Sequence, residues 1–461
     1  TDQSLLSSTL SILGHTLTAS NTSGNSYTAS YTLLQSDTEG TVSFSLTATN
    51  LSGRAGFTTS TSTDGTAVYF DKTAFINQNS IFSTPASAQG GATIDLAPSG
   101  VASDTVCFAP IGTTDFTPSS SITCTTGNAT TLLAPTDGGT YKLFVIDAAG
   151  NVSSGSSAEL IVDNSAPSLS GVTMTSSAAG AYLKSGDVLT LSFTSSKALV
   201  TPTISLLFGG APANGTVHIS NVSGTTWTIT YTMSADDTDG VVSFSVDGIE
   251  DLLGNMGSAV TTTSDGSSLT FDKTLPTLSS VMLFSSNAST TLAKVGDTVK
   301  VTLTASESIS TPSVSFVVNS TPVNGSVTLL HLSGNDWSAS YTANGSDSEG
   351  VVGYTISGFT DTAGNTGQNI SSGSGSVTFD RTSPSIALTS STPNPTGESP
   401  FSVTATFSEP VTGFARSDIT VDNGIASNVA GSGSIYTFDV TPTSNGTITI
   451  DVEAGASSDG A

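Results

Sequence analysis

The stretch that decides the fold is residues 228–248, TITYTMSADDTDGVVSFSVDG. It recurs as residues 338–358, SASYTANGSDSEGVVGYTISG, and more loosely as residues 28–48, TASYTLLQSDTEGTVSFSLTA. Apolar residues alternate with Thr and Ser on either side of an Asp/Gly turn. This period of two is typical of half-buried antiparallel strands joined by turns.

Each copy is followed by an Asp that recurs once per repeat, and the distances between these Asp residues give the repeat length. Asp71 and Asp163 are 92 residues apart, Asp163 and Asp272 are 109 apart, and Asp272 and Asp380 are 108 apart. Solenoid units of about 20–45 residues are shorter than this, whereas one immunoglobulin-like sandwich has about 100 residues. The sequence therefore predicts an all-β chain of tandem immunoglobulin-like antiparallel β-sandwiches, arranged as beads on a string. The predicted domains are residues 1–74, 75–167, 168–276, 277–384 and 385–461.

The two end domains are predicted to be incomplete. Thr1 aligns near Thr201 of the third domain, so the first domain lacks its opening strands, and the last stops before a closing strand. Unpaired strand edges and exposed core favour pairing with another chain. Two interpretations stay open: a segment of a longer protein, or strand exchange in which a neighbouring copy completes the open domain.

Composition excludes several function classes. Lys and Arg number 10 against 36 Asp and Glu, which gives a net charge of −26 and argues against nucleic acid and anionic membranes. Hard cations that take oxygen ligands are favoured, Ca²⁺ first. No apolar run reaches the roughly 18 residues of a membrane span. His15, His218 and His331 occupy non-equivalent repeat positions, and no catalytic motif is present, so we expect no enzyme.

Other residues carry narrower predictions. Cys107 and Cys124 are expected to form a disulfide in an oxidising environment, with free thiols as the alternative. Tyr27, Trp227 and Trp337 recur at one repeat position and are interpreted as core residues, with a ligand platform as the alternative. N-x-[ST] sequons make seven glycosylation candidates: Asn21, Asn128, Asn214, Asn287, Asn324, Asn344 and Asn445.

The sequence resembles bacterial immunoglobulin-like repeats. The resemblance rests on FDKTLP at 271–276, DTAGN at 361–365 and VTATFSEPVTGFARSDITVDNG at 403–424, and it extends over essentially the whole chain. Such repeats occur in large secreted adhesins, biofilm-associated proteins and surface-layer proteins. The resemblance implies a stalk that holds a binding domain away from the cell, and many such domains bind Ca²⁺ where they meet.

Acidic residues at repeated positions are the candidate Ca²⁺ ligands, because carboxylates beside a tight turn suit an oxygen-liganded ion. They comprise the linker residues Asp71, Asp163, Asp272 and Asp380, the D-x-x-G-N residues Asp147, Asp251 and Asp361, the Ser-Glu residues Glu307 and Glu409, and the D-[TS]-[DE]-G residues Asp237, Asp239, Asp347 and Glu349. The alternative is that Asp and Asn only stabilise turns. Two positions depart from the pattern: Asn50 and Arg54 replace D-x-x-G-N in the first domain, and Lys197 replaces the Glu in the third.

Three hypotheses of function follow. The first is a non-enzymatic stalk of an extracellular cell-surface protein, stiffened by Ca²⁺ at its junctions. The second is a subunit of an extracellular filament, sheath or surface layer, assembled by completing its end domains. The third is a carbohydrate-binding module with an exposed Trp. The expected partners are neighbouring domains, other copies of the chain, and surface glycans or other cells.

Overall fold

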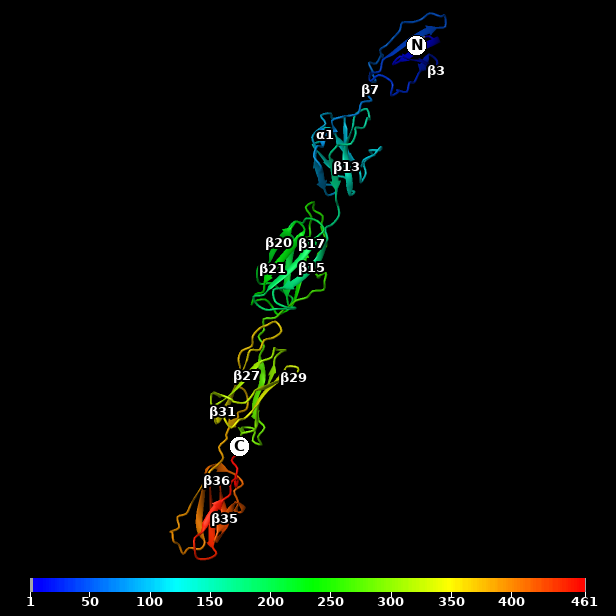
Figure 1. Ribbon diagram of the computed structural model, residues 1–461. Coiled ribbons are helices and arrows are strands. Elements are labelled where there is room, and N and C mark those ends of the chain that lie inside the picture. The colour runs from blue at the N-terminus through cyan, green and yellow to red at the C-terminus, as the bar shows by residue number, and fades with distance from the viewer. Residues whose placement is uncertain (1–2, 461) are drawn as a thin grey trace.

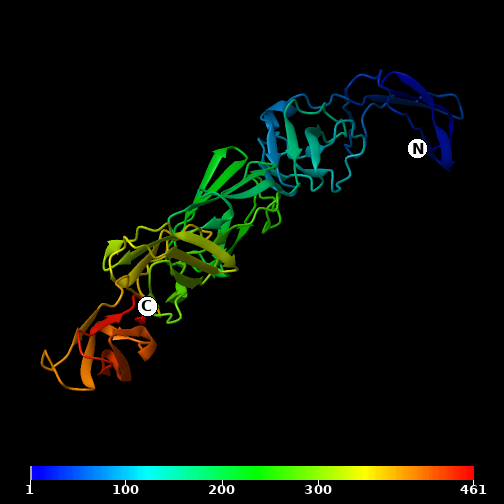
Figure 2. The same cartoon turned by 60° about the horizontal axis from the view of Figure 1, so that its bottom comes forward.

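The chain forms a row of five β-domains in a computed structural model that describes residues 3–460 (Figure 1). The first domain stands at one end of the row, and the C-terminal segment turns back to the boundary between the fourth and fifth domains. The row stays extended when it is turned (Figure 2). Nearly all regular structure is strand, so the all-β, tandem immunoglobulin-like fold class is confirmed.

The third and fourth domains are two-sheet sandwiches of identical topology. In the third, the sheet orders are β15-β17-β21-β20 and β16-β23-β22-β18-β19, and in the fourth they are β24-β26-β30-β29 and β25-β32-β31-β27-β28. The third comprises β15 Leu169–Ser176, β16 Tyr182–Leu183, β17 Val188–Ser195, β18 Thr203–Phe208, β19 Ala211–Pro212, β20 His218–Ser223, β21 Thr226–Thr232, β22 Gly240–Asp247 and β23 Thr270–Phe271. The fourth comprises β24 Leu278–Ser285, β25 Leu292–Ala293, β26 Thr298–Ala305, β27 Ser313–Val318, β28 Thr321–Pro322, β29 Thr328–Ser333, β30 Asp336–Thr342, β31 Gly350–Ser357 and β32 Thr378–Phe379.

Alternation along the strands builds the two cores. In β17, Leu189, Leu191 and Phe193 are buried while the residues between them are less so. Trp227 and Trp337 lie within the cores of the third and fourth domains, and they are 3% and 7% exposed. The core interpretation of both Trp residues therefore holds. Neither indole offers an exposed face on which a sugar could stack.

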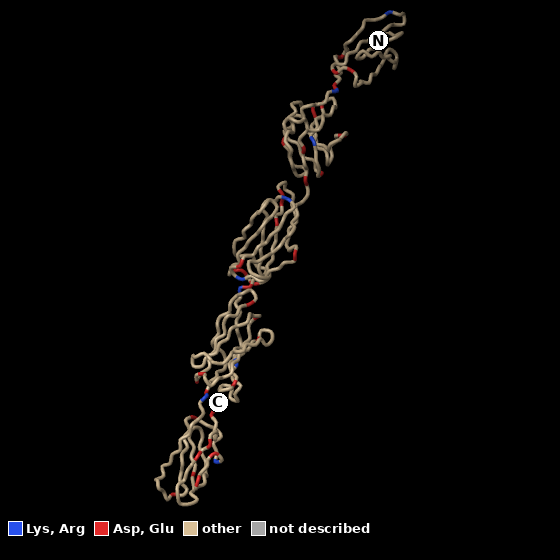
Figure 3. The backbone as a smooth tube through the Cα atoms, in the orientation of Figure 1, with Lys and Arg blue, Asp and Glu red and all other residues tan. Residues whose placement is uncertain are grey.

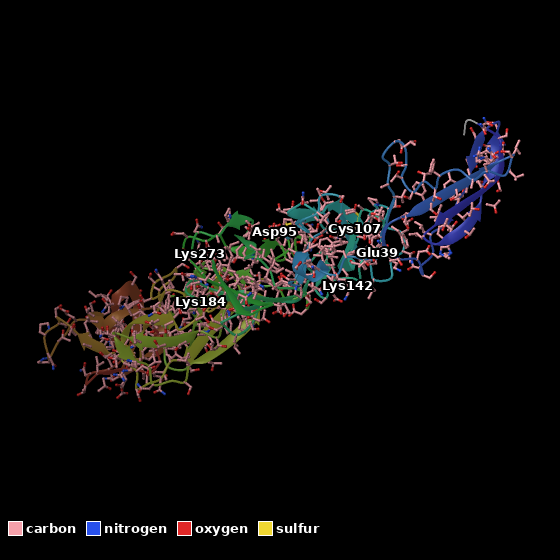
Figure 4. All side chains as sticks on the ribbon, turned by 90° about the horizontal axis from the view of Figure 1, so that it is seen from above. Glu39, Asp95, Cys107, Lys142, Lys184 and Lys273 are labelled. Carbon is pink, nitrogen blue, oxygen red and sulfur yellow. A yellow bond between two sulfur atoms is a disulfide. The ribbon has the colours of Figure 1, made fainter. Side chains whose placement is uncertain are left out.

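The second domain has a different sheet layout. Its sheets are β11-β10-β13-β14-β8 and β12-β9, with β8 parallel to β14. Its elements are α1 Gln78–Ile81, β8 Ala86–Ala88, β9 Thr93–Asp95, β10 Thr105–Ala109, β11 Thr123–Thr126, β12 Thr131–Leu133, β13 Gly139–Ile146 and β14 Glu159–Val162. A disulfide joins Cys107 on β10 to Cys124 on β11, with Cα atoms 4.1 Å apart. Cys107 lies inside this domain in Figure 4.

The fifth domain encloses a core of its own between the sheets β33-β34-β36 and β35-β37. Phe438 and Val440 on β36 are almost completely buried there. The elements are β33 Ile386–Thr389, β34 Phe401–Val411, the 3₁₀ turn η1 Arg416–Asp418, β35 Ile419–Asp422, β36 Gly424–Pro442 and β37 Thr449–Val452.

The first domain is a half-sandwich in residues 3–74. It has sheets β2-β1-β6, β3-β4 and β5-β7, and no counterpart of β15–β17. None of its described hydrophobic side chains is fully buried. Its strands are β1 Leu5–Ile12, β2 His15–Thr18, β3 Ser20–Ser23, β4 Ser26–Thr28, β5 Gly40–Thr41, β6 Phe44–Asn50 and β7 Tyr69–Phe70. Across residues 3–460, no helix is long and apolar enough to cross a membrane.

Candidate cation sites at the domain junctions

Charged residues gather near the domain boundaries, whereas the domain bodies are mostly uncharged (Figure 3). We call the contacts between successive domains junctions 1–2, 2–3, 3–4 and 4–5. Three kinds of side chain, each from a motif that the sequence predicts, build junctions 2–3 and 3–4, and the other two junctions have part of this set. They are the linker Asp, the D-x-x-G-N loop of the following domain, and the residue after a Ser that recurs near or just beyond the end of a long strand in that domain, β17, β26 or β34.

The linker Asp holds its own backbone turn with one carboxylate oxygen. Its Oδ1 accepts a hydrogen bond from the backbone N–H two residues later, and the same contact occurs in all four linkers. The bonds are Thr73 to Asp71 at 3.1 Å, Ser165 to Asp163 at 2.9 Å, Thr274 to Asp272 at 2.9 Å and Thr382 to Asp380 at 2.9 Å. This is the turn role that the sequence left open as an alternative. It engages one oxygen and leaves the other for the junction.

The D-x-x-G-N loop docks the following domain onto the linker. In the fourth domain, Asp361 Oδ1 accepts the backbone N–H of Asn365 at 2.9 Å, and Asp361 Oδ2 accepts its Nδ2 at 2.8 Å. The same Nδ2 donates to the backbone carbonyl of linker Asp272 at 2.9 Å. The equivalent contacts are Asn255 to Asp163 O at 2.9 Å and Asn151 to Asp71 O at 3.2 Å. Three junctions therefore share one docking hydrogen bond.

A Ser that recurs in the third, fourth and fifth domains positions the third junction side chain, the one of the residue that follows it. Ser306 N–H donates to Thr277 O at 2.8 Å, and Thr277 N–H donates to Ser306 Oγ at 3.0 Å. Ser196 in the third domain and Ser408 in the fifth make the same reciprocal pair, with Ser168 and Ser385. The next residue in the chain is then held at the junction. It is Lys197, Glu307 or Glu409.

At junction 3–4 these elements bring three carboxylates together. Asp272, Glu307 and Asp361 each place an oxygen within 4.8 Å of the other two, and Asp361 is only 6% exposed. Burial, followed by the charges of its neighbours, raises the pKa of Glu307. Burial and the nearby Asp361 and Asp239 likewise raise the pKa of Asp272. Converging carboxylates repel one another unless a cation lies among them.

Junction 4–5 repeats this geometry with one carboxylate that the sequence patterns did not identify. Asp380, Glu409 and Asp459 form a second three-carboxylate group within 4.8 Å. Burial and the charges of Asp380 and Asp459 raise the pKa of Glu409. Asp459 follows the fifth domain's last strand as Asp361 follows β31, and the two residues printed after it are too few to display the D-x-x-G-N motif. A cavity of about 510 Å³ beside this group is lined by residues of both domains, Lys294 among them.

Junction 2–3 has a Lys where the other two have a Glu. Lys197 Nζ lies 2.8 Å from Asp163 Oδ2 and 2.8 Å from Asp251 Oδ2, and it also donates to the carbonyl of Ser165. Hydrogen bonding to Lys197, then to Ser165, lowers the pKa of Asp163 to about 2. Burial alone would raise the pKa of Asp251, but hydrogen bonds from Lys197 and Asn255 outweigh it and the net shift is downward.

At junction 1–2 the acidic residues are Asp71 of the linker, Asp147 of the loop and Glu39 of the first domain. Asp147 caps its loop through Ala149 and Asn151 N–H groups, and Asn151 reaches the linker as described. A shared hydrogen bond with Glu39 raises the pKa of Asp71. Among the described residues, the three-carboxylate groups occur at junctions 3–4 and 4–5 alone.

The second acidic residue of the D-[TS]-[DE]-G motif is not one of the three converging carboxylates but holds the linker from the preceding domain. Asp239 accepts Lys273 N–H at 2.8 Å and Thr274 Oγ1–H at 2.6 Å, and Glu349 accepts Arg381 N–H at 3.2 Å. Glu39, at the end of the first domain in Figure 4, does the same to Lys72 and Thr73. These contacts tie the linkers of junctions 1–2, 3–4 and 4–5 to the domain that precedes each of them.

The first Asp of that motif is buried and already engaged in its turn. Asp237 accepts hydrogen bonds from Tyr231 Oη–H at 2.8 Å and from two backbone N–H groups, of Asn214 and Ser234. Asp347 accepts the backbone N–H groups of Asn324 and Asn344 at 2.7 and 2.9 Å. The neighbouring Gly240 is required by space, because a Cβ there would lie 2.6 Å from the Cα of Gly209.

The sequons fall into two groups. The Nδ2 of four of these Asn residues donates to an acceptor within the chain: Asn21, Asn214, Asn287 and Asn324. The other three candidates, Asn128, Asn344 and Asn445, are exposed. Glycosylation remains a prediction.

The fold and its junctions define a tandem immunoglobulin-like array. Residues 380–461 match the family model described as bacterial Ig-like domain, so the predicted resemblance is shown for this part of the chain. No curated protein sequence matches the chain.

Similar solved structures are tandem immunoglobulin fragments. The I-band fragment I67–I69 from titin is 9% identical, with a TM-score of 0.32 over 64% of this chain and 94% of that one. The Escherichia coli adhesin FdeC is 14% identical, with a TM-score of 0.28 over 61% of this chain and 92% of that one.

Proposed function

We propose that this chain is a structural segment of an extracellular cell-surface protein, a stalk whose junctions are stiffened by Ca²⁺. One observation carries the proposal: linker, loop and strand place three carboxylates within 4.8 Å of one another at both junction 3–4 and junction 4–5. The ligands come from the linker and the following domain, and the linker is clamped to the preceding domain through Asp239 or Glu349. An ion bound there fixes the angle between two domains.

The chemistry of the group fits Ca²⁺. This ion takes six to eight oxygen ligands in flexible geometry, and carboxylates bind through one oxygen or both. Asp272, Glu307 and Asp361 supply up to six oxygens, although one oxygen of Asp272 and both of Asp361 also accept hydrogen bonds. Water would complete the shell. Extracellular modules bind Ca²⁺ at about 10⁻⁴–10⁻³ M, which suits a stalk that stiffens outside the cell.

The experiment compares the whole chain in EDTA and in millimolar Ca²⁺ by small-angle X-ray scattering and differential scanning calorimetry. We expect Ca²⁺ to increase the radius of gyration and to raise the melting temperatures of the fourth and fifth domains. Glu307→Gln with Glu409→Gln should abolish both effects. The matched control is Glu159→Gln, which removes a carboxylate paired with Lys142 inside the second domain. Equal scattering and melting in the two buffers would reject the proposal.

We also propose a second candidate, an assembly subunit, because of the first domain's half-sandwich. Strand β21 of the third domain pairs with β17, whereas the equivalent β4 pairs only with β3. A strand from another copy could add there by β-augmentation. Negative-stain microscopy separates the candidates: regular long filaments support assembly, and isolated short rods support the stalk.

A further inference from the structure

The junctions differ in the one residue that follows the repeated Ser. That residue is Lys197 at junction 2–3 and Glu307 at junction 3–4. The surrounding frame is the same: a reciprocal Ser hydrogen-bond pair, a D-x-x-G-N loop, and an Asn that donates to the linker carbonyl. A single side chain therefore changes the charge at an otherwise shared site by two units.

The ammonium of Lys197 uses its full donor capacity at this place. An ammonium has three N–H donors, and Lys197 has three acceptors: Asp163, Asp251 and the Ser165 carbonyl. Asp163 and Ser165 belong to the linker, and Asp251 belongs to the third domain's loop. The Lys197 side chain is 23% exposed and that of Asp251 is 3% exposed, so solvent screens the pair only partly. The contact joins linker to domain without any added ion.

We propose that Lys197 is a built-in cation that locks junction 2–3 permanently, so that this joint holds its angle without metal while junctions 3–4 and 4–5 require a divalent cation. The part concerning metal rests on the proposed function; the part concerning Lys197 does not. The chain is then a stalk of unequal joints. Its second and third domains move as one rigid unit in any ionic condition, and junctions 3–4 and 4–5 stiffen only when the ion is bound.

A second contact across each of these junctions supports a defined angle. Gln89 of the second domain donates to Asn255 Oδ1 at 3.2 Å. Lys184 of the third domain donates to the Gly364 carbonyl of the fourth at 2.8 Å. Lys184 lies on the third domain in Figure 4. Because both junctions have this brace, the difference in their ion dependence is assigned to residues 197 and 307.

The test measures the spread of distances across each junction by pulsed electron paramagnetic resonance on the whole chain. Spin labels are attached through Thr126→Cys with Thr216→Cys for junction 2–3, and through Thr216→Cys with Ser326→Cys for junction 3–4. All three positions are exposed, and the native cysteines are held in their disulfide. Each pair is measured in EDTA and in millimolar Ca²⁺.

We expect the distribution of label-to-label distances across junction 2–3 to be narrow in both buffers. The distribution across junction 3–4 should become narrow only with Ca²⁺. Lys197→Gln should broaden junction 2–3 in both buffers, since it removes the cation without adding a carboxylate. Lys197→Glu recreates the three-carboxylate group and should make junction 2–3 narrow only with Ca²⁺. Glu307→Lys should make junction 3–4 narrow in EDTA. The control Lys300→Gln, within β26, should change neither junction.

The two proposals fail separately. If Lys197→Gln leaves junction 2–3 narrow in EDTA, or if the wild-type junction 2–3 itself needs Ca²⁺, the Lys197 lock is wrong, whatever junction 3–4 does. If junction 3–4 ignores Ca²⁺ while Lys197→Gln broadens junction 2–3, the lock stands and the proposed Ca²⁺ site falls. Circular dichroism melting of each variant confirms that the domains remain folded, so a broad distribution reports the joint.

Discussion

The docking Asn of the D-x-x-G-N loop gives a prediction that can be worked out from two contacts. Asn365→Ala removes the Nδ2 hydrogen bond to the Asp361 carboxylate at 2.8 Å and the one to the Asp272 carbonyl at 2.9 Å. A hydrogen bond to a charged group contributes about 1.5–3 kcal/mol net, and a neutral one about 0.5–1.5 kcal/mol. Asn365 and Asp361 are 8% and 6% exposed, so water replaces these bonds poorly. We expect a loss of about 2–4 kcal/mol from the fourth domain.

Tryptophan fluorescence measures this loss in the whole chain. The sequence holds 2 Trp, so a Trp227→Phe background leaves Trp337 as the reporter of the fourth domain. Urea unfolding followed at this residue gives the free energy of unfolding by linear extrapolation. The matched control is Asn369→Ala, an exposed position four residues along the same segment. A change below about 0.5 kcal/mol for Asn365→Ala, the range of ordinary surface substitutions, would refute the reasoning.

Three further predictions follow from the cores, the disulfide and the junction charges. Trp337→Ala should cost the fourth domain about 3–5 kcal/mol through the cavity it leaves, measured by urea unfolding followed by circular dichroism; a cost below about 1 kcal/mol would contradict its place in the core. Replacing Cys107 and Cys124 with Ser opens a loop of 17 residues and should cost the second domain about 3 kcal/mol, seen as a lower calorimetric transition for that domain alone. Because Lys197 holds the pKa of Asp163 at about 2, below its ordinary 3.8, the lock is complete above that ordinary value and is lost as pH falls through about 2; label distances across junction 2–3 in EDTA should stay narrow at about pH 4, and broadening already there would contradict it.

The repeat and its strand periodicity were enough to predict the fold class. Apolar and polar residues alternate along β17 and β22, and the linker Asp residues recur at regular distances along the chain. Both patterns can be read directly from the sequence. The half-sandwich of the first domain could be predicted in the same way. The repeat segments that form β15–β17 in the third domain have no equivalent in residues 3–74. Such features need no knowledge of distant contacts.

The sequence also indicated most of the junction carboxylates, but it could not separate those that converge at a junction from those that only stabilise a turn. Asp237 and Asp272 are both Asp residues beside turns, yet the first is buried against Tyr231 and the second faces Glu307 and Asp361. Asp459 gave no recognisable motif because the sequence shows only two residues after it. Which acidic side chains converge depends on how a linker meets a loop and a strand end of the following domain in space.

By itself, then, the sequence determined that this is a string of β-sandwiches with acidic, Asp-punctuated linkers, because strand period and repeat length are local properties. Only the tertiary structure decided that Lys197, noted at first as a departure from the pattern, lies between Asp163 and Asp251 with all three of its donors engaged. Residues 163, 197 and 251 are far apart along the chain. The fold brings an ammonium to the place where the next junction has a third carboxylate.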